Sequence, residues 1–169
     1  PENPYPAGLD DIWQAYNWII NYAEPLLGIK TDKILMAGDS AGGNLAMSVT
    51  LRAIKMGIRV PDGCFLAYPA LNMYPKNFSP SYWQSIEDVM LPCSLLNLCI
   101  AAYIPPEFRP LVDPFLSPRV ADDELLKRLP PVRISTGRND PLHDDNWKFL
   151  HKMQSLNKDV RMLVYEGMP

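Results

Sequence analysis

The chain has 169 residues, of which 47% are apolar and 21% charged, and it carries a net charge of −3. These values are ordinary for one globular domain, and they exclude a disordered, fibrous or low-complexity chain. There is no basic excess that would bind nucleic acid, and no apolar run reaches the roughly 18 residues that a transmembrane helix needs. The three cysteines form no CxxC pair. We therefore expect neither a disulfide framework nor a metal site, and the composition favours a reducing, cytoplasmic location.

The first third of the chain alternates amphipathic helices with short apolar runs. Apolar residues at three-to-four spacing indicate a first helix, which we expect to be closed by Pro25 and Gly28. Apolar runs of five or six residues between polar or glycine positions are typical of buried parallel strands. The expected elements are a helix at 9–23, a strand at 33–37, a helix at 44–56 and a strand at 63–68.

The stretch 71–131 differs from what precedes it. It holds ten of the 18 prolines, interleaved with aromatic residues, and we expect only two short helices there, at 94–103 and 122–129. With no linker composition around it, this stretch is better interpreted as an excursion over one end of a sheet than as a separate unit.

Regular alternation returns after the excursion. We expect a strand at 132–137, a helix at 144–156 and a strand at 160–166. Strands that alternate with helices of this length predict an α/β fold, with a mostly parallel sheet covered by helices. Since the chain shows no internal repeat, residues 1–169 are expected to form a single domain.

The strongest chemical signal is GDSAG at residues 38–42, a G-x-S-x-G motif between an expected strand and an expected helix. That setting is typical of a nucleophile elbow, where small neighbours allow a sharp turn that exposes the serine hydroxyl. Ser40 is the candidate nucleophile, and the backbone N–H of Ala41 is a candidate oxyanion donor at the start of a helix. The alternative is a phosphate-binding glycine-rich turn, but neither a following Lys-Ser/Thr nor a G-x-G-x-x-G spacing supports it.

The candidate for the acid of a catalytic triad is Asp140, in the loop after the strand expected at 132–137. A carboxylate at this edge of an α/β sheet can orient an imidazole and stabilise its cation. Asp144 and Asp145 are rivals. They lie where the next helix is expected to begin, so helix capping and interaction with the helix dipole are their expected roles.

A base for this triad is harder to find. In this kind of fold the histidine follows the acid, but His143 lies on the same loop as Asp140 and His151 lies within an expected helix. Residues 1–37 also hold no glycine cluster that would complete an oxyanion hole. Because the chain begins without Met and stops after an expected strand, we expect a piece of a longer protein, with little or no esterase activity by itself.

Several further runs along the chain are specific beyond the elbow. They are PENPYPAGLDD (1–11), GDSAGGNL (38–45), RVPDG (59–63), AYP (67–69), LPPV (129–132), DPLHDD (140–145) and YEGMP (165–169). In this order and spacing, the chain resembles the hormone-sensitive lipase family of α/β-hydrolases over essentially all of its length.

The resemblance implies a partial α/β-hydrolase fold, with Ser40 as nucleophile, Asp140 as acid, and Ala41 and Gly42 shaping the turn and the oxyanion hole. It places the catalytic histidine directly after YEGMP, and a His-Gly-Gly-Gly oxyanion segment upstream of residue 1. The implied activity is hydrolysis of lipid or small acyl esters through an acyl-enzyme, with no metal or organic cofactor. Two alternatives stay open: a small-substrate acetyl esterase or deacetylase, and a hydrolase-fold receptor or scaffold that lacks a complete triad. The oligomeric state is left open.

The apolar and aromatic residues of 71–116 have two interpretations. They can line an acyl pocket, or they can simply pack the excursion onto the sheet, which we expect for at least half of them. The candidates are Met73, Tyr74, Phe78, Tyr82, Trp83, Leu91, Leu95, Leu96, Phe108 and Phe115.

Overall fold

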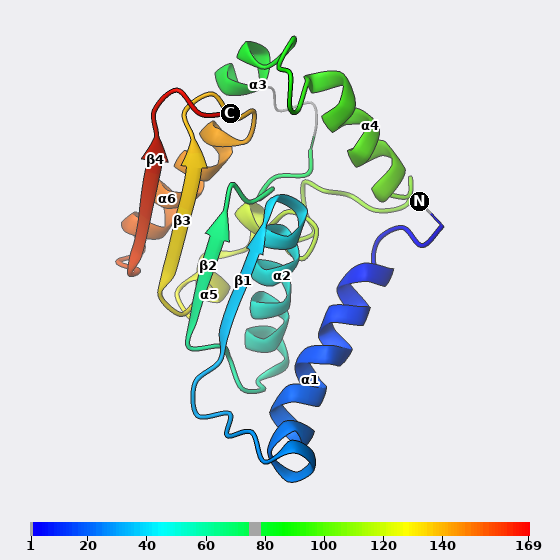
Figure 1. The fold of residues 1–169 in the computed structure, drawn as a ribbon, viewed down its shortest axis with the longest axis vertical. Coiled ribbons are helices and arrows are strands. Elements are labelled where there is room, and N and C mark those ends of the chain that lie inside the picture. Colours follow the sequence, from blue (N-terminus) through cyan, green and yellow to red (C-terminus); the bar gives the residue numbers. More distant parts are fainter. Residues whose placement is uncertain (1, 75–78) are drawn as a thin grey trace.

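A parallel sheet forms the centre of the computed structural model, which describes residues 2–74 and 79–169. Its four strands lie in the order β1-β2-β3-β4 (Figure 1). Each neighbouring pair of strands is parallel, so the predicted parallel α/β sheet is confirmed. The strands are β1 (Leu35–Asp39), β2 (Gly63–Ala67), β3 (Val132–Gly137) and β4 (Val160–Tyr165).

Helices join the strands and build the excursion between β2 and β3. In chain order the described residues form α1 (Ala7–Leu27), α2 (Ser40–Met56), α3 (Pro80–Gln84), α4 (Cys93–Tyr103), the 3-10 helix η1 (Pro118–Val120), α5 (Asp123–Leu126) and α6 (His143–Ser155).

The end of α1 and the presence of α3 differ from the prediction for local reasons. Pro25 lies inside α1 rather than ending it, and the helix continues to Leu27, where Gly28 at φ 66° closes it in the left-handed conformation. The short helix α3 was not predicted. The sequence nevertheless contains the signals for the start of this helix, since the Ser79 hydroxyl accepts a hydrogen bond from the Tyr82 N–H and Pro80 occupies the first helical position.

The hydrophobic core lies between the sheet and the two helices α2 and α6, which pack on the same face of the sheet. Their fully buried side chains and the strand residues opposite them exclude water from this layer. They include Met47, Leu51 and Ile54 of α2, Phe149 and Met153 of α6, and Cys64, Leu66, Val132 and Ile134 of the strands. On the opposite face Leu35, Phe65, Leu163 and Tyr165 are exposed.

The excursion carries α3 and α4 over the carboxyl ends of the strands, as Figure 1 shows, and then returns past α2 through η1 and α5. The buried Asn44 of α2 holds the outgoing and the returning segments of the excursion together, because its amide donates to the carbonyl oxygens of Ala70 at 2.7 Å and Leu116 at 3.0 Å. The expected position of the excursion over one end of the sheet is thus confirmed. The excursion covers the edge of the sheet where α2 begins.

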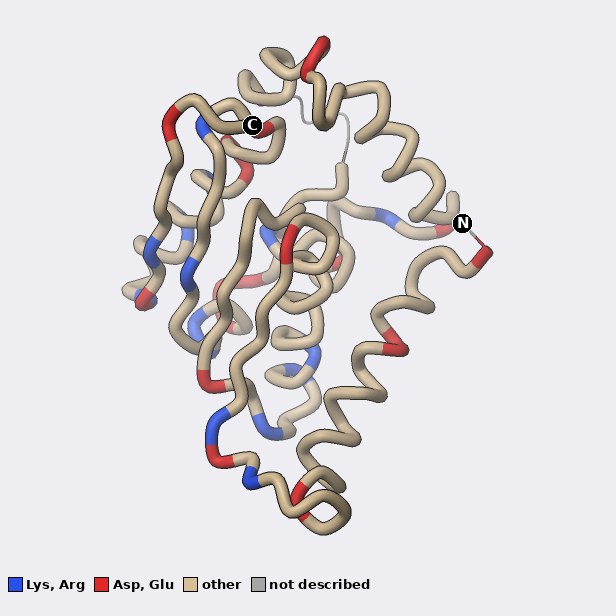
Figure 2. The backbone as a smooth tube through the Cα atoms, in the orientation of Figure 1, with Lys and Arg blue, Asp and Glu red and all other residues tan. Residues whose placement is uncertain are grey.

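Charged residues are interspersed along the described backbone (Figure 2), whereas neither α3 nor α4 contains any. Among the helices of the described residues, none combines the length and apolar character needed to cross a membrane.

Candidate active site

The turn between β1 and α2 contains no linking residue. The strand ends at Asp39 and the helix begins at Ser40, so the strand extends two residues beyond the predicted end and the helix starts four residues before the predicted start. Ser40 adopts φ 49°, a left-handed conformation that residues other than glycine seldom adopt. Strained backbone of this kind concentrates at functional sites.

The glycines around Ser40 explain how strand and helix approach so closely. A Cβ at Gly38 would overlap the carbonyl group of Gly42, and a Cβ at Gly43 would lie 2.8 Å from the Cβ of Pro69. A Cβ at Gly42 would meet only the Asp39 Oδ1 at 3.7 Å, an ordinary contact. The turn therefore requires Gly38 and Gly43 for steric reasons, whereas Gly42 contributes its backbone to the contact with Gly38.

Asp140 lies in the loop between β3 and α6 and is only 5% exposed. Its Oδ1 accepts a hydrogen bond from the Leu142 N–H at 2.7 Å. Burial raises the pKa of Asp140, while the bond from Leu142 and the nearby His143 act in the opposite direction. Ser40 and Asp140 line the same cavity, of about 290 Å³, together with Pro169. The fold thus brings together the two residues that the sequence analysis singled out.

This burial gives a prediction for stability. Because the pKa of Asp140 is raised, ionisation of its carboxyl opposes folding, and stability is lost as the pH rises through the raised pKa. Asp140→Asn keeps an acceptor for the Leu142 N–H but carries no charge. We expect it to raise the Tm at neutral pH, and the difference to shrink as the pH falls through the raised pKa of the wild-type carboxyl.

Asp159 offers a control of opposite sign. Its exposed carboxylate forms a double hydrogen bond with Arg133, at 3.0 and 2.9 Å, and this bond lowers the pKa of Asp159. Asp159→Asn is therefore expected to lower the Tm at neutral pH, with an effect that disappears as the pH falls. A lower Tm for Asp140→Asn at neutral pH would contradict the buried, desolvated position of Asp140.

A second cavity, also of about 290 Å³, includes Ser40 in its lining and is almost entirely apolar. Of the excursion residues expected to line an acyl pocket, Met73, Leu91 and Leu96 line this cavity. The other candidates have different surroundings. Phe108 and Phe115 pack against the core cluster around α1 and α2, and Tyr74 and Tyr82 line a smaller void. Trp83 is 53% and Leu95 42% exposed, and Phe78 lies outside the described residues.

Neither histidine of the chain lines the cavities beside Ser40. His143 is buried at the start of α6, where its Nε2 lies 3.2 Å from Arg138 Nη1 and its ring stacks on Trp147. Because an arginine can only donate, Nε2 is the acceptor. His143 lines a different cavity together with Arg138, and His151 is exposed on α6.

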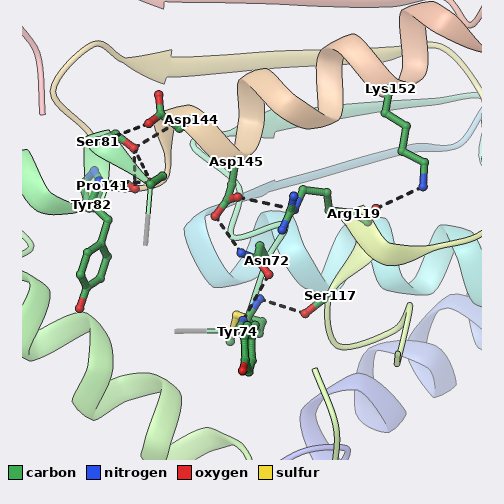
Figure 3. Close-up of polar contacts among 12 residues, drawn as sticks. Asn72, Tyr74, Ser81, Tyr82, Ser117, Arg119, Pro141, Asp144, Asp145 and Lys152 are labelled. Atoms are coloured by element: carbon green, nitrogen blue, oxygen red, sulfur yellow. Dashed lines mark hydrogen bonds and ion pairs between the residues drawn. The ribbon is translucent and has the colours of Figure 1, made fainter. Parts of the chain in front are cut away.

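Asp144 and Asp145 are not helix caps, which corrects one of the two expected roles, but both lie in the first turn of α6, the position expected for an interaction with the helix dipole. The residue before α6 is Leu142, and no side chain caps the helix. The carboxylate of Asp144 accepts instead from the Ser81 N–H at 2.9 Å, and the Ser81 hydroxyl donates to the Pro141 carbonyl oxygen at 3.0 Å (Figure 3). These bonds clamp α3 to the loop that carries Asp140.

The buried carboxylate of Asp145 connects three segments. Its Oδ2 accepts from the Asn72 amide at 3.1 Å, and its Oδ1 lies 3.5 Å from Arg119 Nε (Figure 3). Burial raises the pKa of Asp145, and Asn72 and Arg119 partly offset this. The network joins α6 to both ends of the excursion. Sequence reasoning missed it because Asn72 and Asp145 are 73 positions apart and no local pattern links them.

A strained serine between a parallel strand and a helix, with a buried carboxylate lining the same cavity, is the arrangement of an α/β-hydrolase. A family model described as an alpha/beta hydrolase fold matches residues 1–169, so the chain belongs to this family.

The chain is also similar in sequence to individual proteins. The chain is 48% identical over 103 residues to hormone-sensitive lipase from Homo sapiens, which covers 61% of this chain and 9% of that protein. It is 32% identical over 168 residues to an esterase from Acinetobacter venetianus, covering 99% of this chain and 52% of that protein. The predicted resemblance to the hormone-sensitive lipase family is confirmed.

Solved structures agree with the fold. Carboxyl esterase 2 from Tuber melanosporum matches with a TM-score of 0.91 and 26% identity, over 99% of this chain and 55% of that chain. An esterase from Pyrobaculum calidifontis matches with a TM-score of 0.88 and 30% identity, over 99% of this chain and 53% of that chain. The chain thus spans about half the length of these esterases.

Proposed function

We propose that the protein containing this chain is a serine hydrolase of carboxylic esters, with Ser40 as nucleophile and Asp140 as the acid of its triad. The observation that carries the proposal is the shared cavity: a strained serine at a helix N-terminus and a buried carboxylate line the same 290 Å³ space. Relatives that are named lipase and esterase support the class of reaction.

The first step is attack of Ser40 Oγ on the ester carbonyl carbon while a base removes the hydroxyl proton. The carbonyl oxygen becomes an oxyanion. It lies at the N-terminus of α2, a helix of 17 residues whose first N–H groups, that of Ala41 among them, have no partner within the helix. The alcohol then leaves with a proton from the base, and water repeats the sequence to release the acid.

We assign the base to a histidine in the segment that follows Pro169 in the whole protein. Pro169 lines the cavity that holds Ser40 and Asp140. The Asn139 N–H donates to the Met168 carbonyl oxygen at 2.9 Å, and a Cβ at Gly137 would overlap the carbonyl groups of Met168 and Pro169. The chain leaving β4 is therefore held against the loop of Asp140, where an imidazole can reach both the acid and the nucleophile.

A fluorophosphonate probe on the whole protein tests the proposal. The reagent phosphonylates an activated serine, so mass spectrometry of the digested protein should find the adduct on the peptide that contains Ser40. Absence of labelling, together with no turnover of p-nitrophenyl esters, would favour the receptor or scaffold over the enzyme.

A further inference from the structure

The cavity that holds Ser40 and Asp140 carries an excess of negative charge. Its described lining contains two carboxyl groups, those of Asp140 and Asp88, and no lysine, arginine or histidine. Asp88 lies in the loop between α3 and α4. Burial is the main cause of the raised pKa of Asp140, and the charge of Asp88 adds to it. The two carboxylates therefore act on the same space from different segments of the chain.

The Asp88 carboxylate is only partly used by the fold. Its Oδ1 accepts hydrogen bonds from the Met90 N–H at 2.8 Å and the Leu91 N–H at 2.7 Å, which shapes the turn before α4. Within the described parts of the chain, Oδ2 has neither a hydrogen-bond donor nor an ion-pair partner. Asparagine could form the same turn, because its side-chain oxygen accepts the same two bonds. The turn therefore does not require the charge of this residue.

An aromatic ring borders the same space. Tyr68 directly follows β2, lines the cavity and is 40% exposed. Its backbone adopts φ 35°, a conformation that bulky residues seldom adopt and that concentrates at functional sites. A phenol ring attracts a cation through its negative face, and a carboxylate attracts the cation by its charge. The two groups together have the chemistry that recognises a substituted ammonium.

The proposed reaction decides which part of an ester enters this cavity. The alcohol oxygen receives its proton from the base, which we assign to the segment after Pro169, beside Asp140. The alcohol arm therefore leaves on this side of Ser40. During the transfer Asp140 balances the charge of the protonated base, so the charge of Asp88 stays available to the alcohol. This step rests on the proposed function.

We propose that the cavity beside Asp140 selects the alcohol arm of the substrate by charge, with Asp88 and Tyr68 favouring esters of amino alcohols over uncharged esters of the same shape. In a partly solvated cavity, one carboxylate should change the reaction of a singly charged substrate about fivefold. An ester whose alcohol carries a phosphate or a carboxylate is disfavoured for the same reason.

The test compares butyrylcholine with 3,3-dimethylbutyl butyrate on the whole protein, because the two esters have the same shape and differ by one positive charge. The readout is the ratio of kcat/KM for the charged ester to that for the neutral ester within each variant. This ratio cancels any general loss of folded or active protein. Asp88→Asn keeps the turn and should lower the ratio about fivefold. Tyr68→Leu should lower the ratio about threefold, whereas Tyr68→Phe keeps the ring and should leave the ratio unchanged.

Glu87→Gln is the matched control. Glu87 is an exposed acid next to Asp88 in the chain, but it does not line the cavity. Its ratio should equal the wild-type ratio at physiological ionic strength, where salt screens exposed charges more than about 8 Å apart. A fall as large as that in Asp88→Asn would show a general effect of net charge and would remove the role of Asp88.

A ratio within about 1.5-fold of wild type in Asp88→Asn overturns the inference. Binding separates this failure from a failure of the proposed function. Calorimetric titration of the Ser40→Ala protein with the two esters measures the same preference without turnover. A preference for butyrylcholine that an added Asp88→Asn abolishes, in a protein that hydrolyses no ester, would remove the proposed reaction and keep the cation site. Hydrolysis of both esters without a preference for the charged one would keep the reaction and remove the selection by charge.

Discussion

Ser40→Ala in the whole protein is expected to lower kcat/KM for p-nitrophenyl esters by at least about 10⁴-fold and to abolish labelling by a fluorophosphonate. The hydroxyl is the only atom of this side chain that can form the acyl-enzyme, and no neighbouring residue replaces it. Alanine adds no atom to this position and meets the same restriction on positive φ as serine does. The fold should therefore survive, and the loss should fall on turnover rather than on the amount of folded protein.

Ser48→Ala provides a matched control for that result. Ser48 lies on the same helix and is fully buried, and its hydroxyl has no hydrogen-bond partner among the described residues. Removing an unpaired buried hydroxyl is neutral or stabilising. The Ser48→Ala protein should therefore match the wild type in both turnover and labelling. If Ser40→Ala retained more than about 1% of the wild-type activity, the nucleophile would have to be another residue.

The order of the helices and strands could be predicted from the sequence because that order depends on local patterns. Apolar runs of five or six residues predict buried strands, and β2 and β3 lie where these patterns place them. Boundaries were less predictable. Helix α2 begins at Ser40 although Gly42 and Gly43 follow, because the close packing of the turn outweighs the low helix propensity of these two glycines.

The two candidate site residues were accessible from the sequence for a similar reason. Ser40 lies in a motif five residues long, and Asp140 follows a recognisable strand. The surroundings of these residues were not accessible. The bonds of Asp144 to Ser81 and of Asp145 to Asn72 join positions 63 and 73 apart. Such pairs depend on how the excursion folds back, which no local spacing records.

The largest structural effect is expected from Gly38→Ala. Its added Cβ would overlap the carbonyl group of Gly42 and lie 2.8 Å from the backbone nitrogen of Gly43, so β1 and α2 would have to separate. Overpacking against rigid backbone costs about 2–3 kcal/mol of the free energy of unfolding. A shift of Ser40 by about 1 Å should lower kcat/KM at least 100-fold in the protein that remains folded. Urea denaturation and active-site titration measure the two effects separately.

Gly42→Ala separates the steric argument from a general intolerance of the motif. A Cβ there meets only Asp39 Oδ1, at 3.7 Å, and the position is already helical. Because alanine favours a helix over glycine by up to about 1 kcal/mol, the free energy of unfolding should be unchanged or higher. The same substitution four residues apart should thus lower stability at position 38 but not at position 42. Equal destabilisation by both would mean that the contact between Gly38 and the Gly42 carbonyl does not hold the turn together.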